Sequence, residues 1–173
     1  MKKRSIHEPE LKDSYFDGFE YKGYKVKTNL VIEGQNEYRP LKLTKPSQVY
    51  EAFKKLVFSD RERFYSVLLD NKCKVIGVDM VSQGSLTFAP VVPREVYKAA
   101  VLSSAASVIF IHSHPSGDPE PSETDRELTK QLYLGGELLG IEMLDHVIIG
   151  QDSFYSFAEK EDICPEKRNL RTK

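Results

Sequence analysis

Two histidines, a serine and an aspartate gather in one short stretch of the chain, residues 112–125, which reads HSHPSGDPEPSETD. In a β-strand, side chains two residues apart point to the same face, so His112 and His114 can present their rings side by side. Pro115 ends such a strand, and the loop after it can return Asp125 to the rings from the first turn of a helix. Two imidazoles and one carboxylate leave the fourth position of a tetrahedral zinc ion open, as in a catalytic metal site.

The same residues also fit an ordinary helix start. In SETD, Ser122 can accept a hydrogen bond from a first-turn N–H while the Asp125 side chain reaches back to the Ser122 amide, which makes a capping box. Taken alone, the motif favours the capping box, because such four-residue patterns recur throughout helical proteins. The combination is more specific: half of the four histidines of the chain lie two residues apart, beside a broken loop that ends on a serine and an aspartate.

The elements expected around this stretch are those of an α/β domain without internal repeats. SVIFIHSH, residues 107–114, shows little polar alternation, as in a strand buried on both faces, and Ser122 begins a helix after the loop. RFYSVLLD and CKVIGVDMVSQGS are β-runs joined by the polar turn NK, which predicts a hairpin. Helices are expected after Ser47 as the N-cap residue and from Pro93, and IEMLDHVIIG is expected to form another strand. The helix after Ser47 has an apolar face of Val49, Ala52, Phe53, Leu56 and Val57.

Three segments organise the chain. Residues 1–46 form an N-terminal extension whose alternating stretch YKVKTNLVIEG fits an edge strand or a hairpin. Residues 47–158 form the α/β domain, and residues 159–173 form a basic C-terminal tail that is expected to be solvated.

Composition limits the possible function classes. The 173 residues carry a formal net charge of −1, so the overall charge offers no reason to expect a polyanionic partner, and tight nucleic-acid binding is not expected. The two cysteines cannot build a disulfide framework or a four-cysteine zinc site, which suits a reducing cytoplasm. We find neither a signal peptide nor an apolar stretch that approaches the roughly 18 residues of a membrane span. A cytoplasmic protein without a membrane segment is therefore predicted.

Beyond these local patterns, the chain resembles a known family. The spacing H-x-H-x7-S-x-x-D, completed by His112, His114, Ser122 and Asp125, is similar to the signature of JAMM (JAB/MPN+) zinc metalloproteases. More narrowly, residues 47–158 resemble the JAB domain of bacterial RadC-type proteins, from RERFYSVLLDNKCKVIG to LDHVIIGQDSFYSF. The resemblance implies a mixed β-sheet flanked by helices, with the JAB/MPN (cytidine-deaminase-like) architecture.

The resemblance also implies roles for five residues. His112, His114 and Asp125 would be the zinc ligands, Glu62, just before the first core strand, would be the general acid/base, and Ser122 would donate to the oxyanion. From the residues alone, Glu62 is instead a surface glutamate in the charged run DRER. The expected protein is a zinc-dependent metallohydrolase, a peptidase or isopeptidase with a peptide or isopeptide substrate.

The chain departs from the family pattern in two places. Ser113 gives H-S-H-P where RadC-type proteins commonly read H-N-H-P, but this position faces away from the metal side of the strand. Residues 1–46 show neither the length nor the glycine hairpin of the helix-hairpin-helix-like region of longer RadC-type proteins, which weakens a DNA-binding inference. The alternative function that stays open is a DNA-repair-associated or mobile-element accessory protein, whose JAB domain binds metal and acts on or with nucleic-acid-linked partners.

Two further features stay open. Asp145 and His146 are a polar pair inside an apolar strand, and they are either partners of the metal ligands or core groups satisfied by hydrogen bonds. The segment GSLTFAPVVPRE is a candidate edge of a substrate groove, where an extended peptide could add a strand.

Overall fold

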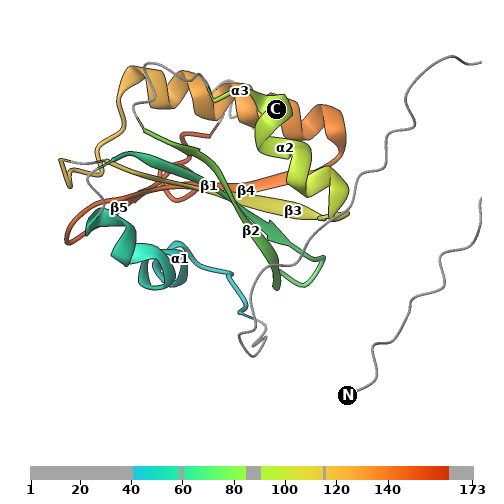
Figure 1. The fold of residues 1–173 in the computed structure, drawn as a ribbon, viewed down its shortest axis with the longest axis horizontal. Helices are drawn as coiled ribbons and strands as arrows, with labels where there is room; N and C mark the ends of the chain where they lie inside the picture. The colour runs from blue at the N-terminus through green and yellow to red at the C-terminus, as the bar shows by residue number, and fades with distance from the viewer. Residues whose placement is uncertain (1–40, 59–60, 85–90, 115, 164–173) are drawn as a thin grey trace, which may run out of the picture. The chain divides into compact units, whose positions relative to one another are not determined.

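The computed structural model describes residues 41–58, 61–84, 91–114 and 116–163, and these build a three-layer α/β domain. One mixed sheet of five strands, in the order β2-β1-β3-β4-β5, forms the middle layer. Figure 1 shows α2 and α3 on one face of this sheet and α1 on the other. The predicted fold class, a mixed sheet flanked by helices, is confirmed.

The elements follow one another along the chain with short connections. In order they are α1 (Pro46–Phe53), the 3-10 helix η2 (Lys54–Phe58), β1 (Arg63–Leu69), β2 (Val75–Gln83), α2 (Pro93–Leu102), β3 (Ser107–Ser113), α3 (Glu123–Leu139), β4 (Glu142–Ile149) and β5 (Phe154–Ser156).

The predicted hairpin of β1 and β2 is confirmed, and its turn is held by Asp70. The Oδ1 atom of Asp70 accepts hydrogen bonds from the backbone N–H groups of Lys72 (2.8 Å) and Lys74 (2.9 Å). Cys73 takes the positive φ of 57° that reverses the chain. The two strands then pair antiparallel along their length, which places β1 between β2 and the central strand β3.

The central strand determines where the ends of the other strands meet. β3 is antiparallel to β1 but parallel to β4, and α3 makes the crossover between β3 and β4. All seven residues of β3 are buried, as the sequence predicts. Because the carboxyl ends of parallel strands lie at one edge of a sheet, the loops after β3 and β4 are neighbours.

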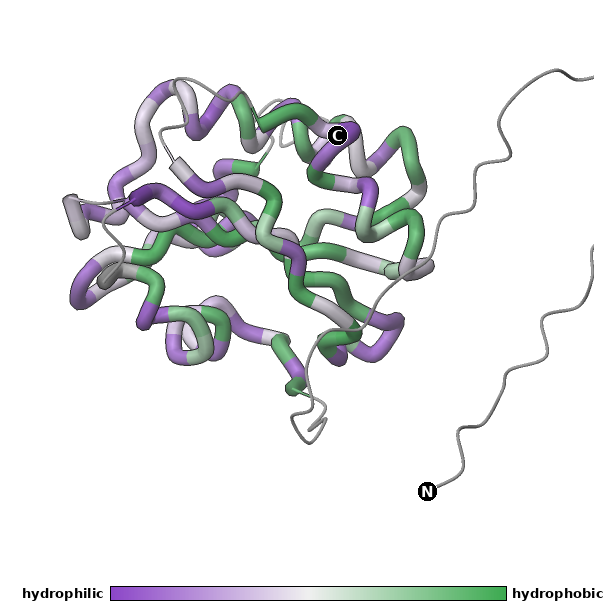
Figure 2. Tube along the Cα trace, in the orientation of Figure 1, coloured by the Kyte–Doolittle hydropathy of each residue, from purple (hydrophilic) through white to green (hydrophobic). Residues whose placement is uncertain are grey.

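Hydrophobic residues cover both faces of the sheet. The cluster under α2 and α3 includes Phe64, Val96 and Phe110, and the cluster under α1 includes Val49 and Ile109. Figure 2 shows the hydrophobic residues gathered along the central strands. Alternate residues of one strand therefore serve different cores, and the two faces can be assigned residue by residue.

The first helix begins earlier than the sequence predicts. α1 starts at Pro46, so Lys45 and not Ser47 is the N-cap residue. Proline suits the first helical position because it has no N–H to leave unsatisfied. The side chain of Gln48 accepts hydrogen bonds from the backbone N–H groups of Thr44 (2.8 Å) and Lys45 (3.2 Å), just before the helix begins.

This helix also ends earlier than predicted. The chain changes to a 3-10 helix after Phe53, so the apolar face that the sequence extends to Val57 belongs to two elements rather than one. The short strand β5 was not predicted, because three residues are too few to show an alternating pattern.

Several predictions fall on residues that the structure does not describe. The stretch YKVKTNLVIEG within residues 1–40, residues 85–90 of the candidate groove segment and the C-terminal residues 164–173 lie outside the described residues. Within the described ranges, no helix has the length and hydrophobicity needed to cross a lipid bilayer.

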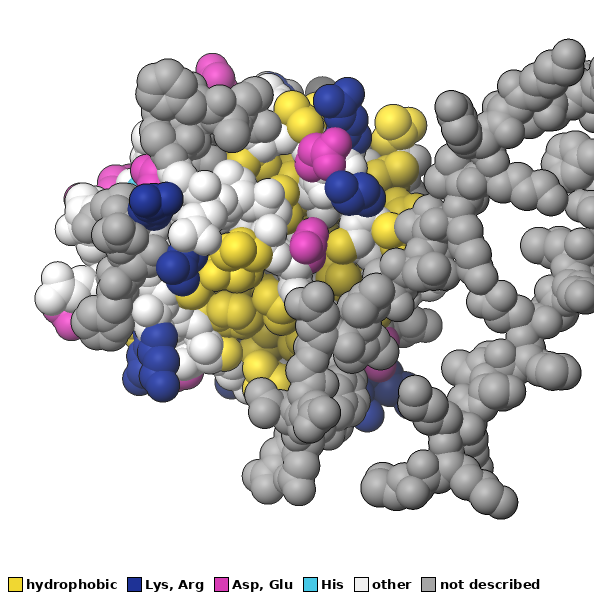
Figure 3. All heavy atoms as spheres, in the orientation of Figure 1, with side chains coloured by type: hydrophobic (Ala, Val, Ile, Leu, Met, Phe, Trp, Pro, Cys, Tyr) yellow, Lys and Arg dark blue, Asp and Glu magenta, His cyan; other side chains and the backbone are white. Residues whose placement is uncertain are grey.

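The edge strand β2 exposes hydrophobic side chains on the described surface. Val78 and Met80 are each 49% exposed, and both lie opposite buried or half-buried residues of β1. Figure 3 shows hydrophobic side chains gathered on this face between α1 and β2, with lysine, arginine and acidic side chains scattered around them.

Candidate metal centre

The end of β3 brings the two histidines together, as predicted. His112 is the second-last residue of the strand and faces α3. Its ring lies 6.1 Å from that of Phe64 on the neighbouring strand β1. His114 follows the strand on the same side, and the two imidazole rings lie 4.6 Å apart at 84° to each other. The side chain of His112 is 1% exposed and that of His114 is 15% exposed, so the outer histidine is the one that solvent can reach.

The start of α3 brings Asp125 to these rings, and the predicted capping box is confirmed as well. The Ser122 backbone N–H donates to Oδ2 of Asp125 (2.8 Å), and the Asp125 N–H donates to the hydroxyl oxygen of Ser122 (3.2 Å). The Ser122 hydroxyl itself donates to the same carboxylate oxygen (2.6 Å). The two interpretations of SETD are therefore compatible, because the cap orients the carboxylate that faces the histidines.

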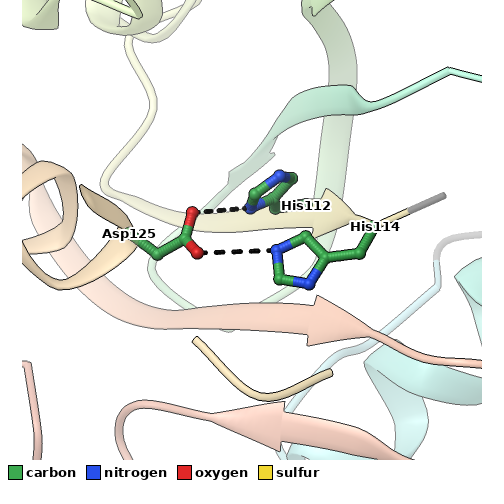
Figure 4. Close-up of side chains that lie close together, drawn as sticks. All are labelled: His112, His114 and Asp125. Carbon is green, nitrogen blue, oxygen red and sulfur yellow. Dashed lines mark ion pairs between the residues drawn. The ribbon is translucent and has the colours of Figure 1, made fainter. Parts of the chain in front are cut away.

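The three side chains converge as metal ligands do. His112 Nδ1 lies 3.3 Å from Asp125 Oδ1, and His114 Nε2 lies 3.5 Å from Asp125 Oδ2, as Figure 4 shows. One ligand atom from each residue lies within 4.8 Å of the other two. Ligands about 2.0–2.1 Å from a tetrahedral zinc ion stand about 3.4 Å apart, and the two histidine–carboxylate distances are close to this value.

A buried nitrogen of His112 without a hydrogen-bond partner also indicates a metal site. His112 Nδ1 is buried and has no hydrogen-bond partner, although it faces a carboxylate. A buried polar atom without a partner is costly, and a cation between the ring and the carboxylate would satisfy both. The residues present therefore fit a metal ion.

The charges of the cluster are arranged to keep Asp125 ionised. Burial alone raises the pKa of the Asp125 carboxyl, but contacts with His112, His114 and Ser122 outweigh burial and hold the pKa far below its usual range. The Asp125 carboxylate in turn raises the pKa of His114, against the opposing effect of burial. A negative charge is thus available between the two rings at neutral pH.

Two buried residues, Thr129 and His146, are linked to Asp125 by hydrogen bonds. The hydroxyl of Thr129 donates to the backbone carbonyl of Asp125 (2.6 Å) and lies 2.7 Å from His146 Nδ1. Because a hydroxyl has one hydrogen, we assign the proton of the second bond to His146 Nδ1. Burial lowers the pKa of His146 to about 3, so this ring is neutral. His146 is therefore connected to the metal cluster through Thr129.

Asp145, its neighbour in sequence, has a different place. It lies opposite Ile109 in the β3/β4 register, on the α1 side of the sheet and away from the histidines. Its carboxylate accepts hydrogen bonds from the hydroxyl of Ser156 (2.7 Å) and the N–H of Ala158 (3.0 Å). Asp145 is thus a core group satisfied by hydrogen bonds, and only His146 supports the cluster.

The strand register places Glu62 beside His114. β1 and β3 pair Phe64 with His112 and Arg63 with Ser113, so the next position, Glu62, extends toward His114 on the same side. The charge of Glu62 also contributes to the raised pKa of His114. Glu62 is half-buried rather than fully exposed. The run DRER by itself indicates an exposed surface glutamate, and this describes only part of the environment of Glu62.

Known proteins match this chain over most of its length. A family model described as "RadC-like JAB domain" matches residues 43–162. A "UPF0758 protein" of Trichlorobacter lovleyi is 49% identical over 119 residues, which cover 68% of this chain and 52% of that protein. A "UPF0758 protein" of Methanosarcina mazei is 43% identical over 120 residues, 69% of this chain and 52% of that protein. The chain thus spans about half the length of the curated relatives it matches.

Proposed function

Because the chain belongs to the RadC-like JAB domain family, we propose that it is a zinc-dependent hydrolase that cleaves a peptide or isopeptide bond. The observation that carries the proposal is the convergence of His112, His114 and Asp125. Three protein ligands that leave the fourth position of a tetrahedral ion open are typical of a catalytic metal site rather than a structural one.

The donor set favours zinc. Two imidazole nitrogens and one carboxylate oxygen suit zinc and related transition metals, whereas magnesium and calcium prefer sites built of oxygen atoms alone. His112, His114 and Asp125 would hold the ion. When bound, zinc acts as a Lewis acid and lowers the pKa of a coordinated water to about 7, which supplies a nucleophile at neutral pH.

Glu62 is the proposed general acid/base. It lies on the side of the histidines, on the more accessible edge of the cluster next to His114. From there its carboxylate accepts the proton of the attacking water and delivers it to the leaving amine, a role that contributes typically 10²- to 10⁴-fold in rate. Asp125 cannot take this role, because its ionised carboxylate is committed to the two histidines and the helix cap.

Ser122 is proposed to act twice. Its amide and hydroxyl orient Asp125, as the cap geometry requires. When the hydroxyl turns from Asp125 to the substrate, it supplies one donor to the oxyanion of the tetrahedral intermediate, an interaction worth a few kcal/mol in the transition state. The two roles need different rotamers of one short side chain, and the backbone N–H of Ser122 still holds the Asp125 carboxylate while the hydroxyl is away.

The hydrolase is preferred over a DNA-associated accessory role on grounds of charge. The formal net charge of the chain is −1, and on the face in Figure 3 the basic side chains are interspersed with acidic and hydrophobic ones. Binding to a nucleic-acid backbone instead favours a continuous basic surface.

The test begins with the metal and continues with the substrate. Elemental analysis of the purified protein should find about one zinc per chain, and a variant with both His112→Ala and His114→Ala should lose it. The zinc-loaded protein should then release product from a panel of peptides and lysine-linked isopeptides, and the double variant is the matched control. Unchanged zinc in the double variant would contradict the site, and a metal-loaded protein inert to every substrate of the panel would contradict the reaction.

A further inference from the structure

The turn between β4 and β5 touches the loop that follows His114 and leads to α3. β3 and β4 run parallel, and their register pairs Ser113 with Ile149, so the residue after each strand leaves the same edge of the sheet. Those next residues are His114 and Gly150. The loop after β3 and the β4–β5 turn therefore lie next to each other.

Backbone hydrogen bonds join this turn to the loop. The N–H of Gln151 donates to the carbonyl of Gly117 (2.8 Å), and the N–H of Gly117 donates to the carbonyl of His114 (3.0 Å). Gly117 has a positive φ of 75°, which is accessible to glycine at little cost. The loop is thus folded back on His114 and attached to the turn at the same residue.

The attached loop supplies the hydrogen-bond partner of the His114 ring. The carbonyl oxygen of Asp118, the residue after Gly117, lies 2.7 Å from His114 Nδ1. A carbonyl can only accept, so Nδ1 must carry the proton. In a neutral ring Nε2 then keeps its lone pair, and Nε2 is the atom that faces Asp125.

Gly150 allows the close approach on which this attachment depends. A Cβ atom at Gly150 would lie 2.6 Å from Cδ of Pro119 and 2.7 Å from the carbonyl oxygen of Gly117. Both distances are shorter than any normal contact, so a side chain here must push the loop away. Because Gly150 does not have a positive φ, alanine would suit its backbone, and the substitution acts only through these contacts.

We propose that Gly150 and Gln151 are positioning residues of the metal centre: they hold the 117–119 loop so that the Asp118 carbonyl directs the lone pair of His114 Nε2 toward the metal. This inference rests on the proposed metal site and adds to it the element that sets the ring orientation. Partners of this kind typically change metal affinity by about 10- to 100-fold when they are lost.

The first test is Gly150→Ala, with Gly136→Ala as the matched control. At Gly136 a Cβ would lie 2.6 Å from both the Ile141 carbonyl oxygen and the Tyr97 hydroxyl, an equally severe contact between α3 and its neighbours rather than at the ligand loop. Competition with a chromogenic chelator should show zinc binding about 10- to 100-fold weaker in the Gly150 variant. The control should bind zinc as the unmodified chain does, whatever stability it loses. Equal zinc affinity in the Gly150 variant and the unmodified chain would overturn the inference.

The second test needs no metal, and its first measurement is made on the unmodified chain. In the metal-free, full-length protein, at a pH where the ring is neutral, ¹⁵N NMR of His114 should show the tautomer with the proton on Nδ1. The proton on Nε2 would overturn the inference, even if zinc binds normally. If the unmodified chain bound no zinc but showed the Nδ1 tautomer, the proposed function would fail while the ring-orienting role of the loop stood. In a folded Gly150→Ala variant, the Nδ1 tautomer should lose its dominance.

Discussion

The substitution Asp145→Asn should stabilise the protein at neutral pH, although it removes a hydrogen-bonded carboxylate. Burial raises the pKa of Asp145 to about 6 from its ordinary value of 3.8, and the hydrogen bonds from Ser156 and Ala158 offset only part of this effect. As the pH rises, the unfolded chain loses its proton first, while the folded protein keeps it until about pH 6. The unfolding free energy therefore falls between the two pKa values and is constant above them.

The size of the effect follows from the interval between the two pKa values. At about 1.4 kcal/mol for each pH unit, the folded protein loses roughly 3 kcal/mol between pH 3.8 and about pH 6. Asp145→Asn removes this loss because the amide does not ionise. The amide oxygen can still accept from the Ala158 N–H, and the amide nitrogen can donate to the Ser156 hydroxyl, which also accepts from the Glu159 N–H (3.0 Å).

The assay is urea unfolding of the two proteins, from about pH 4 to about pH 8, in the presence of a chelator so that metal binding does not contribute. The difference in unfolding free energy should be close to zero at the acid end and should approach roughly 3 kcal/mol in favour of the variant at the neutral end. All other groups titrate in both proteins, so they cancel in the difference.

A difference that does not change with pH would refute the reasoning, because it would mean that the folded protein does not raise the pKa of Asp145. The substitution also tests the position of this residue. Asp145 lies on the α1 side of the sheet, so zinc content and turnover should be the same in Asp145→Asn and the unmodified chain. Loss of turnover at full zinc occupancy would instead make Asp145 a candidate base.

Glu62→Gln should keep zinc content and thermal stability while turnover falls by 10²- to 10⁴-fold or more, since the amide keeps the size of the side chain but not its basicity; full activity at full zinc occupancy would remove Glu62 from its role. Asp125→Asn should weaken zinc retention, measured by dialysis and elemental analysis, and activity should follow occupancy. Chelation should lower the Tm of the unmodified chain. Zinc at about 100 times its Kd should raise the unfolding free energy by about 2.7 kcal/mol, and the Asp125→Asn variant should not show this rise at the same zinc concentration. DNA affinity should be weak and fall steeply with salt in filter-binding titrations, so tight binding that persists at moderate salt would contradict the expected partner class.

Local sequence determined the parts of the site that lie within one element. The spacing of His112 and His114 is enough to place both rings on one face, because strand geometry alternates with a period of two. The capping box of Ser122 and Asp125 likewise needs only one helical turn. The uninterrupted apolar run before His112 indicated the central buried strand, because a strand covered on both faces has no polar side.

Helix and strand ends were less predictable from local sequence. Ser47 has the chemistry of an N-cap, but Pro46 before it fits the first helical position, so Lys45 is the N-cap residue and the Gln48 side chain accepts from its backbone N–H. The apolar pattern through Val57 does not distinguish a continuous α-helix from one that tightens to a 3-10 helix after Phe53. Boundaries depend on which of several weak local preferences packs best against the sheet.

Only the tertiary structure decided which distant residues join the cluster. The register of β1 with β3 extends toward the pair Glu62 and His114, and nothing in the run DRER marks its third residue as different from the others. Asp145 and His146 are adjacent in sequence, yet the alternation of β4 sends one to each face of the sheet. The sequence gives no sign that a side chain at Gly150 would collide with Pro119, because this close approach exists only when two parallel strands end side by side. Local patterns specify which side chains a segment presents, but strand pairing and close packing specify what those side chains meet, and these depend on residues far apart along the chain.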